Sequence, residues 1–378
     1  MNAGARAPLI LLAAGGTGGH LFPAEALANV LQARGVTVDL ATDSRAAAYA
    51  KKFPARKTHV IPSDTVRGRN PLRLLWTILV LAVGIVRAIF LMLYLRPAAV
   101  VGFGGYPTLP PLFAAWLTGV PRVVHEQNAV MGRANRALAA RATAIATGYP
   151  NIFTGRPDLA LKAMHTGNPV RAAVREAASR DYEAPEAGDA IRLLVFGGSQ
   201  GARIMSEIVP GAIELCSPAT RARIRVVQQC REPDIAEVKA VYARLNVPAE
   251  LAVFFSDLPA RMADSHLVIA RSGASTVAEL AALGRPSILV PLPHALDNDQ
   301  LANATALAAT GGALLIRQDE FTAERLADEL TQLAGDSSQL SGMAIAARRT
   351  GKADAAERLA DLVLRVAGHA QMSQNLSA

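Results

Sequence analysis

The residues Leu9-Ile10-Leu11-Leu12-Ala13-Ala14 lead directly into the glycine loop Gly15-Gly16-Thr17-Gly18-Gly19-His20. A short apolar run that ends in glycines is typical of a buried strand turning into a helix. The run also imitates a secretion signal, but it is short and the glycines follow at once, so we predict a strand. The next segment, from Leu21 to Arg34, has a helical period and stops at Gly35, which predicts the helix after the loop.

A second stretch repeats this order, because the apolar run Ile191–Phe196 is followed by Gly197-Gly198-Ser199-Gln200-Gly201. Elsewhere, short runs rich in β-branched residues alternate with Ala- and Leu-rich segments of helical period. The alternation predicts an α/β fold with two Rossmann-like domains, whose parallel sheets face each other across a cleft. The predicted strands are residues 9–13, 37–41, 57–61, 98–102, 122–125, 144–147, 191–196, 223–228, 251–254, 267–269, 287–291 and 313–316.

The length of 378 residues exceeds one ordinary domain and suits two. We place the boundary in the segment Thr166-Gly167-Asn168-Pro169-Val170-Arg171, ahead of a polar stretch at residues 179–189 that reads as a surface loop. The first domain is predicted to cover residues 1–167 and the second residues 168–350. A last helix at residues 354–367 is predicted to pack back on the first domain.

The chain has 39 Lys and Arg against 31 Asp and Glu, a formal net charge of +8. Such a surplus suits nucleic acid, a nucleotide or an anionic membrane, or it reflects only an Arg-rich composition. No Lys/Arg cluster alternates with aromatic residues and no nucleic-acid-binding signature is present, so no nucleic-acid partner is expected. Cys216 and Cys230 lack CxxC spacing and are expected to be free thiols in a reducing compartment.

Three glycine loops follow predicted strands, the third being Gly102-Phe103-Gly104-Gly105-Tyr106. Glycines there let backbone N–H groups approach a phosphate at a helix N-terminus, although one such loop can serve the turn alone. The spacing is not GxGxxG, and Asp39 lies within the second strand instead of at its end, so a dehydrogenase is not expected. No Walker lysine is present either. Together the loops indicate a phosphorylated ligand at the carboxyl ends of both sheets.

Six motifs that occur in order carry a family resemblance. They are Gly15-Gly16-Thr17-Gly18-Gly19-His20, Gly104-Gly105-Tyr106, His125-Glu126-Gln127-Asn128, Gly167-Asn168-Pro169-Val170-Arg171, Gly197-Gly198-Ser199-Gln200-Gly201-Ala202-Arg203 and Arg271-Ser272-Gly273-Ala274-Ser275-Thr276-Val277-Ala278-Glu279. The match runs from the first strand to the last helix. In these motifs the chain resembles the family of peptidoglycan glycosyltransferases that convert lipid I into lipid II.

The resemblance implies a GT-B fold and an inverting, metal-independent transfer of N-acetylglucosamine from UDP-N-acetylglucosamine to lipid I, with no cofactor. It also implies a peripheral protein on the cytoplasmic face of the inner membrane, with other cell-wall synthesis proteins as candidate partners. The residues that it implies for the UDP part are Arg171, Ser199, Ala274, Ser275, Thr276, Glu279 and Gln300. Those implied for the sugar are Thr17, Gly18, Gly19 and Asn128.

Physical reasoning agrees with this implied placement. The loop at Ser199 opens a helix, whose positive end suits a diphosphate. Arg171 places a fixed cation beside the linker between the domains, where closure could bring it to the leaving UDP. The Glu279 carboxylate can accept hydrogen bonds from both ribose hydroxyls.

The chain departs from the family pattern in two places. Where the family has a His-Gln-Thr/Ser-Gly run, this chain has Gln228-Gln229-Cys230-Arg231, so no hydrogen bond of that histidine carries over. Where the family has a His-Gln pair, this chain has Asp299-Gln300, which keeps the glutamine.

His20 is the candidate general base, because an imidazole at the glycine loop can take the proton from an attacking sugar hydroxyl. The alternative is that His20 caps the helix or orients the loop. His125 and Glu126, with Gly104, Gly105 and Tyr106, are candidates for acceptor contact, and the alternative is structural hydrogen bonding under the sheet. Asp297-Asn298-Asp299 fits the metal-binding DxD pattern, but a solvated acidic turn is the favoured interpretation, so no metal site is predicted.

The segment between Asn70-Pro71 and Arg96-Pro97 predicts one long apolar helix, with Arg87 as its interior charge. From Leu74 to Leu95 it is long enough to span a bilayer, but spanning would cut one sheet in two and bury Arg87. We predict a helix that lies on an anionic membrane surface, flanked by Arg67, Arg69 and Arg73. The alternative is a helix buried in the domain.

Two other functions fit parts of the sequence. One is a GT-B glycosyltransferase with a different lipid or natural-product acceptor, which the first-domain motifs disfavour. The other is a non-catalytic nucleotide-sugar-binding protein, which the joint presence of His20, Glu279 and Gln300 disfavours.

Overall fold

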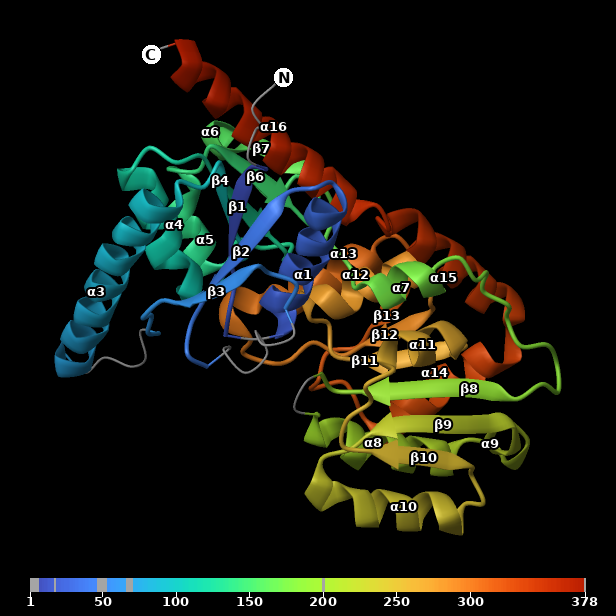
Figure 1. Ribbon diagram of the computed structural model, residues 1–378. Coiled ribbons are helices and arrows are strands. Elements are labelled where there is room, and N and C mark those ends of the chain that lie inside the picture. Colours follow the sequence, from blue (N-terminus) through green and yellow to red (C-terminus); the bar gives the residue numbers. More distant parts are fainter. Residues whose placement is uncertain (1–6, 17, 46–52, 66–70, 199–200, 377–378) are drawn as a thin grey trace. The chain divides into compact units, whose positions relative to one another are not determined.

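The computed structural model describes residues 7–16, 18–45, 53–65, 71–198 and 201–376 (Figure 1). The chain divides into two compact units. Unit 1 comprises Met1–Arg171 and Asp354–Ala378, and unit 2 comprises Ala172–Ala353.

Unit 1 is built on a parallel sheet. Its seven described strands lie in the order β3-β2-β1-β4-β5-β6-β7. The elements are β1 (Leu9–Ala13), α1 (Gly18–Ala33), β2 (Thr37–Thr42), β3 (Lys57–Val60), α3 (Pro71–Leu95), β4 (Ala99–Gly102), η1 (Tyr106–Thr108), α4 (Leu109–Leu117), β5 (Arg122–Glu126), α5 (Arg133–Ala139), β6 (Ala144–Thr147), α6 (Pro157–Ala160), β7 (Ala163–His165) and α16 (Ala355–Leu376).

The alternating side chains of β1 enter two different cores. Ile10 and Leu12 belong to a core cluster with α1 and α16, whereas Leu11 and Ala13 belong to one with α3, α4 and α5. Successive residues of a strand point to opposite faces, so this central strand is buried on both sides. The prediction of a strand here is confirmed.

The C-terminal helix α16 completes the core of unit 1. Leu359 and Val363 are fully buried in the cluster that contains Ile10 and Leu12, and α16 packs along α1 (Figure 1). Arg34 near the end of α1 also forms an ion pair with Asp361 at 2.6 Å.

Unit 2 contains a second parallel sheet, whose six described strands lie in the order β10-β9-β8-β11-β12-β13. Leu193 and Val195 of β8 face a core formed with α8, α10 and α14, while α7, α11 and α12 pack on one another and α11 contacts β8. The elements are α7 (Ala172–Ala177), β8 (Ile191–Phe196), α8 (Arg203–Leu215), α9 (Pro218–Arg223), β9 (Ile224–Gln229), η2 (Glu232–Asp234), α10 (Ile235–Arg244), β10 (Ala249–Ala252), α11 (Leu258–Asp264), β11 (Leu267–Ala270), α12 (Ala274–Leu283), β12 (Ser287–Leu289), η3 (Leu296–Asn298), α13 (Asp299–Ala308), β13 (Ala313–Leu315), α14 (Ala323–Gly335) and α15 (Ser337–Thr350).

The predicted α/β fold with two Rossmann-like parallel sheets is confirmed, and each predicted strand corresponds to an observed one. β10 lies two residues before its predicted position, because Val253 and Phe254 are apolar but exposed. β7 was not predicted, since three residues give too short a pattern. Cys216 and Cys230 are free and buried, as expected.

Helix α3 begins at Pro71 and ends at Leu95, as predicted, and Arg96 has a positive φ of 48°. It packs on α4 (Figure 1), where a Cβ on Gly84 would lie 3.2 Å from Cγ of Pro110. Gly84 also lets α3 approach the segment after β3, because a Cβ there would lie 2.1 Å from the Pro62 carbonyl oxygen. The alternative that α3 is fully buried in the domain is wrong, because only Thr77, Gly84, Ala88 and Met92 of this helix are buried. By length and composition α3 could cross a membrane, but it is the crossover between β3 and β4 of one sheet.

Candidate active site

In unit 1, two glycine loops meet where the strand order changes direction. β1 and β4 are neighbours in the sheet, and β1 leads to the loop at Gly15 while β4 leads to the loop at Gly104. Connections that leave such neighbouring strands in opposite directions open a crevice at their carboxyl ends, which is where ligands bind in open α/β sheets. The structure thus brings together loops that are about ninety residues apart in the chain.

The imidazole of His20 lies against the second loop. A Cβ on Gly104 would lie 3.5 Å from Nε2 of His20, and one on Gly105 would lie 3.2 Å from Cε1. Both glycines have positive φ angles, 83° and 75°, which residues other than glycine rarely adopt. The loop can therefore place its backbone directly against the ring, and Tyr106 begins η1 immediately after it.

The protonation state of His20 suits a base. Burial lowers its pKa below the ordinary 6.5, and a hydrogen bond with the backbone of Gly15 partly offsets that shift. The neutral imidazole that results can accept a proton at neutral pH. His20 is the third residue of α1, so it is inside the helix and does not occupy the N-cap position. Thr17, also predicted for this site, lies outside the described residues.

Glu126 organises the loop that carries Asn128. Its carboxylate accepts hydrogen bonds from the Asn128 and Gly132 backbone N–H groups, both at 2.9 Å, and from Asn135 Nδ2 at 2.9 Å. Burial raises the pKa of Glu126, while these hydrogen bonds oppose the shift. Sequence reasoning missed Asn135, whose only signal was a polar residue on a short helix after the His125–Asn128 motif.

His125 is fully buried and packs against Phe103, with ring centroids 5.5 Å apart. Its Nε2 lies 3.3 Å from the Gly167 carbonyl oxygen, and burial lowers its pKa to about 4. Because Glu126 is also only 1% exposed, the burial of both side chains favours the structural interpretation over acceptor contact. We infer that they support the Asn128 loop, and Asn128 itself is partly exposed.

Arg171 lies over the first turns of α1. Its guanidinium is 4.8 Å from the centroid of the Phe22 ring, and that ring also contacts Gly18. The positive charge lowers the pKa of Glu25, although burial raises that pKa by more. The implied UDP ligand Arg171 is therefore adjacent to the glycine loop within unit 1.

Unit 2 has a corresponding change of strand direction between β8 and β11. The loop after β8 leads to α8 and the loop after β11 leads to α12, so the two helices start next to neighbouring strands. The N-cap residues of these helices, Ala202 and Gly273, form no side-chain cap hydrogen bond, and Ala274, Ser275 and Thr276 are partly exposed. The backbone N–H groups of a helix N-terminus suit an anion.

Glu279 lies on the second turn of α12. At 1.5 Å per residue its Cα is about 7.5 Å along the axis from that of Ala274. A nucleoside diphosphate bound at the N-terminus could therefore extend its ribose toward this carboxylate. Ser199, the other residue implied for the phosphates, lies outside the described residues.

Gln300 forms hydrogen bonds with the loops that follow β11 and β12, at the carboxyl edge of the unit 2 sheet. Its Oε1 accepts from the Leu292 N–H at 3.0 Å, and its carbonyl accepts from Ser272 Oγ at 2.8 Å. Arg271 secures the neighbouring segment by donating to the carbonyl oxygens of Val290 and Pro291. No role was predicted for Arg271 or Ser272, although both belong to the motif that runs from Arg271 to Glu279.

The Asp297-Asn298-Asp299 turn shows no arrangement typical of a metal site. Asp297 and Asn298 have positive φ, and Asp299 Oδ1 accepts the Gln300 N–H at 2.7 Å. Among all described residues, no group of three His, Cys, Asp or Glu side chains is placed to hold a metal ion.

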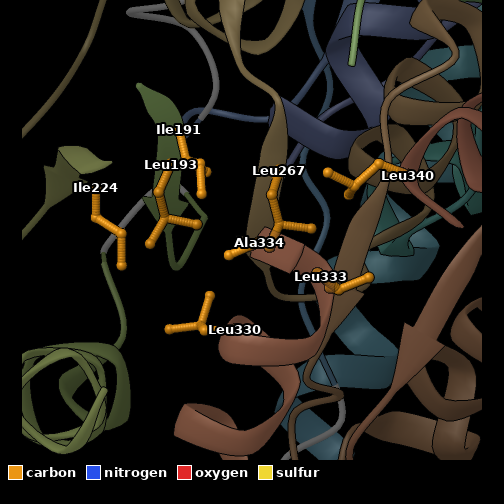
Figure 2. Close-up of a pocket in the computed structure, with 8 residues that line it drawn as sticks. All are labelled: Ile191, Leu193, Ile224, Leu267, Leu330, Leu333, Ala334 and Leu340. Atoms are coloured by element: carbon orange, nitrogen blue, oxygen red, sulfur yellow. The ribbon is translucent and has the colours of Figure 1, made fainter. Parts of the chain in front are cut away.

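A small apolar cavity in unit 2 is separate from these loops. Figure 2 shows the residues that line it. Ile191, Ile224 and Leu267 are the first residues of β8, β9 and β11, whereas the glycine loop at Gly197 follows the last residue of β8. The cavity is lined by Ile191, Leu193, Ile224, Leu267, Leu330, Leu333, Ala334 and Leu340. Since no polar side chain enters it, we interpret it as an imperfection of core packing between the sheet and α14.

Comparison with known proteins assigns the class. The glycosyltransferase family 28 N-terminal domain matches residues 10–147, and the C-terminal domain of the same family matches residues 192–359. The chain therefore belongs to glycosyltransferase family 28. Its two units show the GT-B arrangement of Rossmann-like sheets that the sequence predicted.

Particular relatives are more informative. The chain is 58% identical to the UDP-N-acetylglucosamine--N-acetylmuramyl-(pentapeptide) pyrophosphoryl-undecaprenol N-acetylglucosamine transferase of Rhodopseudomonas palustris (strain BisB18), over 98% of this chain and 99% of that one. The transferase of the same name from Nitrobacter winogradskyi is 59% identical over 96% of this chain and 98% of its own. The crystal structure of Acinetobacter baumannii MurG matches with a TM-score of 0.77 and 30% identity, covering 95% of this chain and 99% of that chain.

Proposed function

We propose that this protein transfers N-acetylglucosamine from UDP-N-acetylglucosamine to lipid I, undecaprenyl-pyrophosphoryl-N-acetylmuramoyl-pentapeptide, to give lipid II and UDP. The observation that carries the proposal is the near-complete match to transferases with that name, at up to 60% identity. The N-terminus of α12 in unit 2 suits the UDP diphosphate, and the imidazole of His20 in unit 1 suits removal of the acceptor proton, as such a transfer needs.

In the proposed reaction, His20 takes the proton of the acceptor sugar hydroxyl as its oxygen attacks the anomeric carbon of the donor. The bond from that carbon to the UDP oxygen breaks, the configuration inverts, and the proton passes from His20 to solvent. The α12 N-terminus and Arg171 offset the negative charge that develops on UDP. Asn128, Gly18 and Gly19 are proposed to orient the sugars.

The proposed role of Glu279 is to select the nucleotide through its ribose. Replacing Glu279 with alanine leaves the ribose hydroxyls without their acceptor, so the KM for UDP-N-acetylglucosamine should rise by about 10- to 100-fold, equivalent to roughly 1.5–3 kcal/mol. Steady-state kinetics at saturating acceptor measure this. Glu324→Ala, at a fully solvent-exposed carboxylate on α14, serves as the control. An unchanged donor KM would contradict the assignment.

Transfer is expected to continue in excess EDTA. Helix N-termini and an arginine can offset the diphosphate charge that a divalent ion offsets in other enzymes. The rate in EDTA should be within about twofold of the rate with added Mg²⁺, because no step is assigned to a metal. Strict dependence on Mg²⁺ or Mn²⁺ that disappears in Asp297→Ala would show instead that the acidic turn binds a metal.

The exposed face of α3 is proposed to lie on the cytoplasmic leaflet of the inner membrane. Its large apolar side chains include Trp76, Leu79 and Phe90, which are 62%, 54% and 68% exposed. Arg73 and Arg87 on the same helix are exposed and can meet anionic headgroups. The flanking Arg67 and Arg69 lie outside the described residues. A peripheral helix of this kind would bring the enzyme to a membrane-bound acceptor, and to any cell-wall synthesis proteins working there.

The decisive assay follows radiolabel from UDP-N-acetylglucosamine into a short-chain lipid I analogue. Formation of a lipid II analogue with release of UDP supports the proposal. Transfer to other glycolipids but not to lipid I would favour a different acceptor. Binding of UDP-N-acetylglucosamine without any transfer would favour a nucleotide-sugar-binding protein.

A further inference from the structure

Gln229 is the last residue of β9, at the carboxyl edge of the unit 2 sheet, and it is only 5% exposed. Its Oε1 accepts a hydrogen bond from the Gly197 N–H at 3.3 Å, and its Nε2 donates to the Val253 carbonyl at 3.1 Å. Because β9 lies between β8 and β10, this one amide joins the ends of both neighbouring strands. One of those ends is the start of the glycine loop.

The glycine loop depends on such external contacts for its position. A Cβ on Gly197 would lie 2.2 Å from the Ala202 nitrogen, so the chain folds back too tightly there for any side chain. Gly198 has a φ of 91°, and glycines in general are conformationally permissive. Gly197 and Gly198 have no side chains with which to hold the start of the loop, so the hydrogen bond from Gly197 to Gln229 helps to fix its position.

Arg231 supports the other end of the loop. A Cβ on Gly201, whose φ is 70°, would lie 3.1 Å from Cγ of Arg231. The guanidinium is held by Asp234 through two hydrogen bonds, both of 2.8 Å. The arginine stem is therefore fixed in place beneath Gly201.

We propose that Gln229 is a positioning residue for the donor substrate. By accepting a hydrogen bond from the Gly197 N–H, Gln229 fixes the position of the chain between β8 and α8, where the diphosphate of the UDP-sugar is proposed to bind. Arg231 supports the same connection at Gly201. This inference rests on the proposed function. Gln229 does not touch the substrate, so its effect appears in donor affinity and not in the chemistry of the acceptor.

The test is Gln229→Met, which keeps the length of the side chain and removes both hydrogen bonds. We expect the Kd for UDP and the KM for UDP-N-acetylglucosamine to rise together by roughly tenfold. The acceptor KM should stay within about twofold, because the acceptor residues are in unit 1. Calorimetry with UDP and steady-state kinetics with both substrates varied measure these quantities.

Gln228→Met is the matched control. Gln228 is the preceding residue of the same strand, is fully buried, and also forms two side-chain hydrogen bonds. Those bonds go to the Met205 carbonyl in the first turn of α8 and to the Tyr242 hydroxyl of α10, and neither reaches Gly197 or Gly201. The control should lower Tm without changing the Kd for UDP. Equal effects of the two variants on UDP binding would overturn the proposal, as would a kcat loss in Gln229→Met with unchanged donor KM.

Arg231→Met tests the same idea at a more exposed side chain if Gln229→Met does not fold. Its Kd for UDP should rise about threefold, and in the double variant the two effects should be less than multiplicative, because both act on one loop. An unchanged Kd in Arg231→Met would contradict the support at Gly201. If the wild-type protein binds no UDP, the proposed function itself fails. If the wild type binds UDP and the variants bind it equally well, only the positioning role of Gln229 and Arg231 fails.

Discussion

Replacing His20 with alanine is expected to lower kcat by about 100- to 10,000-fold, which is the usual contribution of a general base. The Kd for UDP should change little, because the residues proposed for the nucleotide, apart from Arg171, are in unit 2. In the wild-type enzyme the acid limb of the kcat/KM profile should lie below pH 6.5, since burial lowers the pKa of His20 from that value. As pH falls through this lowered pKa, the imidazole gains a proton and can no longer act as a base. Rate profiles across pH measure both effects.

Two further variants separate the base from a residue that only orients the loop. His20→Asn and His20→Gln keep an amide that can hydrogen-bond the Gly15 backbone but cannot take up a proton. Both should be as inactive as His20→Ala. If either retains most of the wild-type kcat, His20 orients the loop and another group removes the proton. His294→Ala, at an exposed histidine in unit 2, is the matched control and should retain full activity.

Changing Trp76, Leu79 and Phe90 to serine together should detach the protein from anionic vesicles. Full burial of one such side chain is worth ~1.5–3 kcal/mol. Half of that for each of the three gives about 2–4 kcal/mol, or roughly a 30- to 1,000-fold weaker partition. Transfer to a long-chain acceptor in vesicles should slow accordingly, while transfer to a short, water-soluble acceptor should be nearly unchanged. Vesicle sedimentation and the two transfer assays measure these outcomes.

The folded state should tolerate this triple change, because all three side chains are more than half exposed. A control variant with Leu215→Ser and Ile345→Ser removes exposed apolar side chains from unit 2 and should leave vesicle binding unaffected. High salt should release part of the wild-type protein, since the arginines contribute through screened charges. Unfolding of the triple variant, or wild-type protein that stays in membranes through carbonate extraction, would contradict a peripheral helix.

The local pattern of the chain predicts most of the fold, because buried parallel strands appear as short apolar runs and their loops as glycines. Predictions failed where that pattern was too short, as at β7, or where exposed apolar residues displaced it, as at Val253 and Phe254. The strand order does not follow from such patterns. The order decides that the ring of His20 meets Gly105, and that Gln229 meets Gly197.

The sequence pattern likewise did not predict that the side chains of His125 and Glu126 are buried. His125 and Glu126 have the residue types of a binding site and follow a strand in the expected place. Their candidacy weakens because Asn135, from a helix that follows, donates to Glu126 and completes a network of internal hydrogen bonds. The Glu126 carboxylate, which already accepts these hydrogen bonds inside the unit, has little left to offer a ligand.

The packing of α16 against α1 has a consequence for the order in which this protein folds as it is made. Leu359 and Val363 fill the core beside Ile10 and Leu12, so that core stays uncovered until α16 has been synthesised. Unit 2, Ala172–Ala353, is complete before α16, although its residues are synthesised after most of unit 1. Domains usually fold in the order of their synthesis. Here the second unit can reach its native state first, while the apolar surface of the first stays exposed until α16 packs on it.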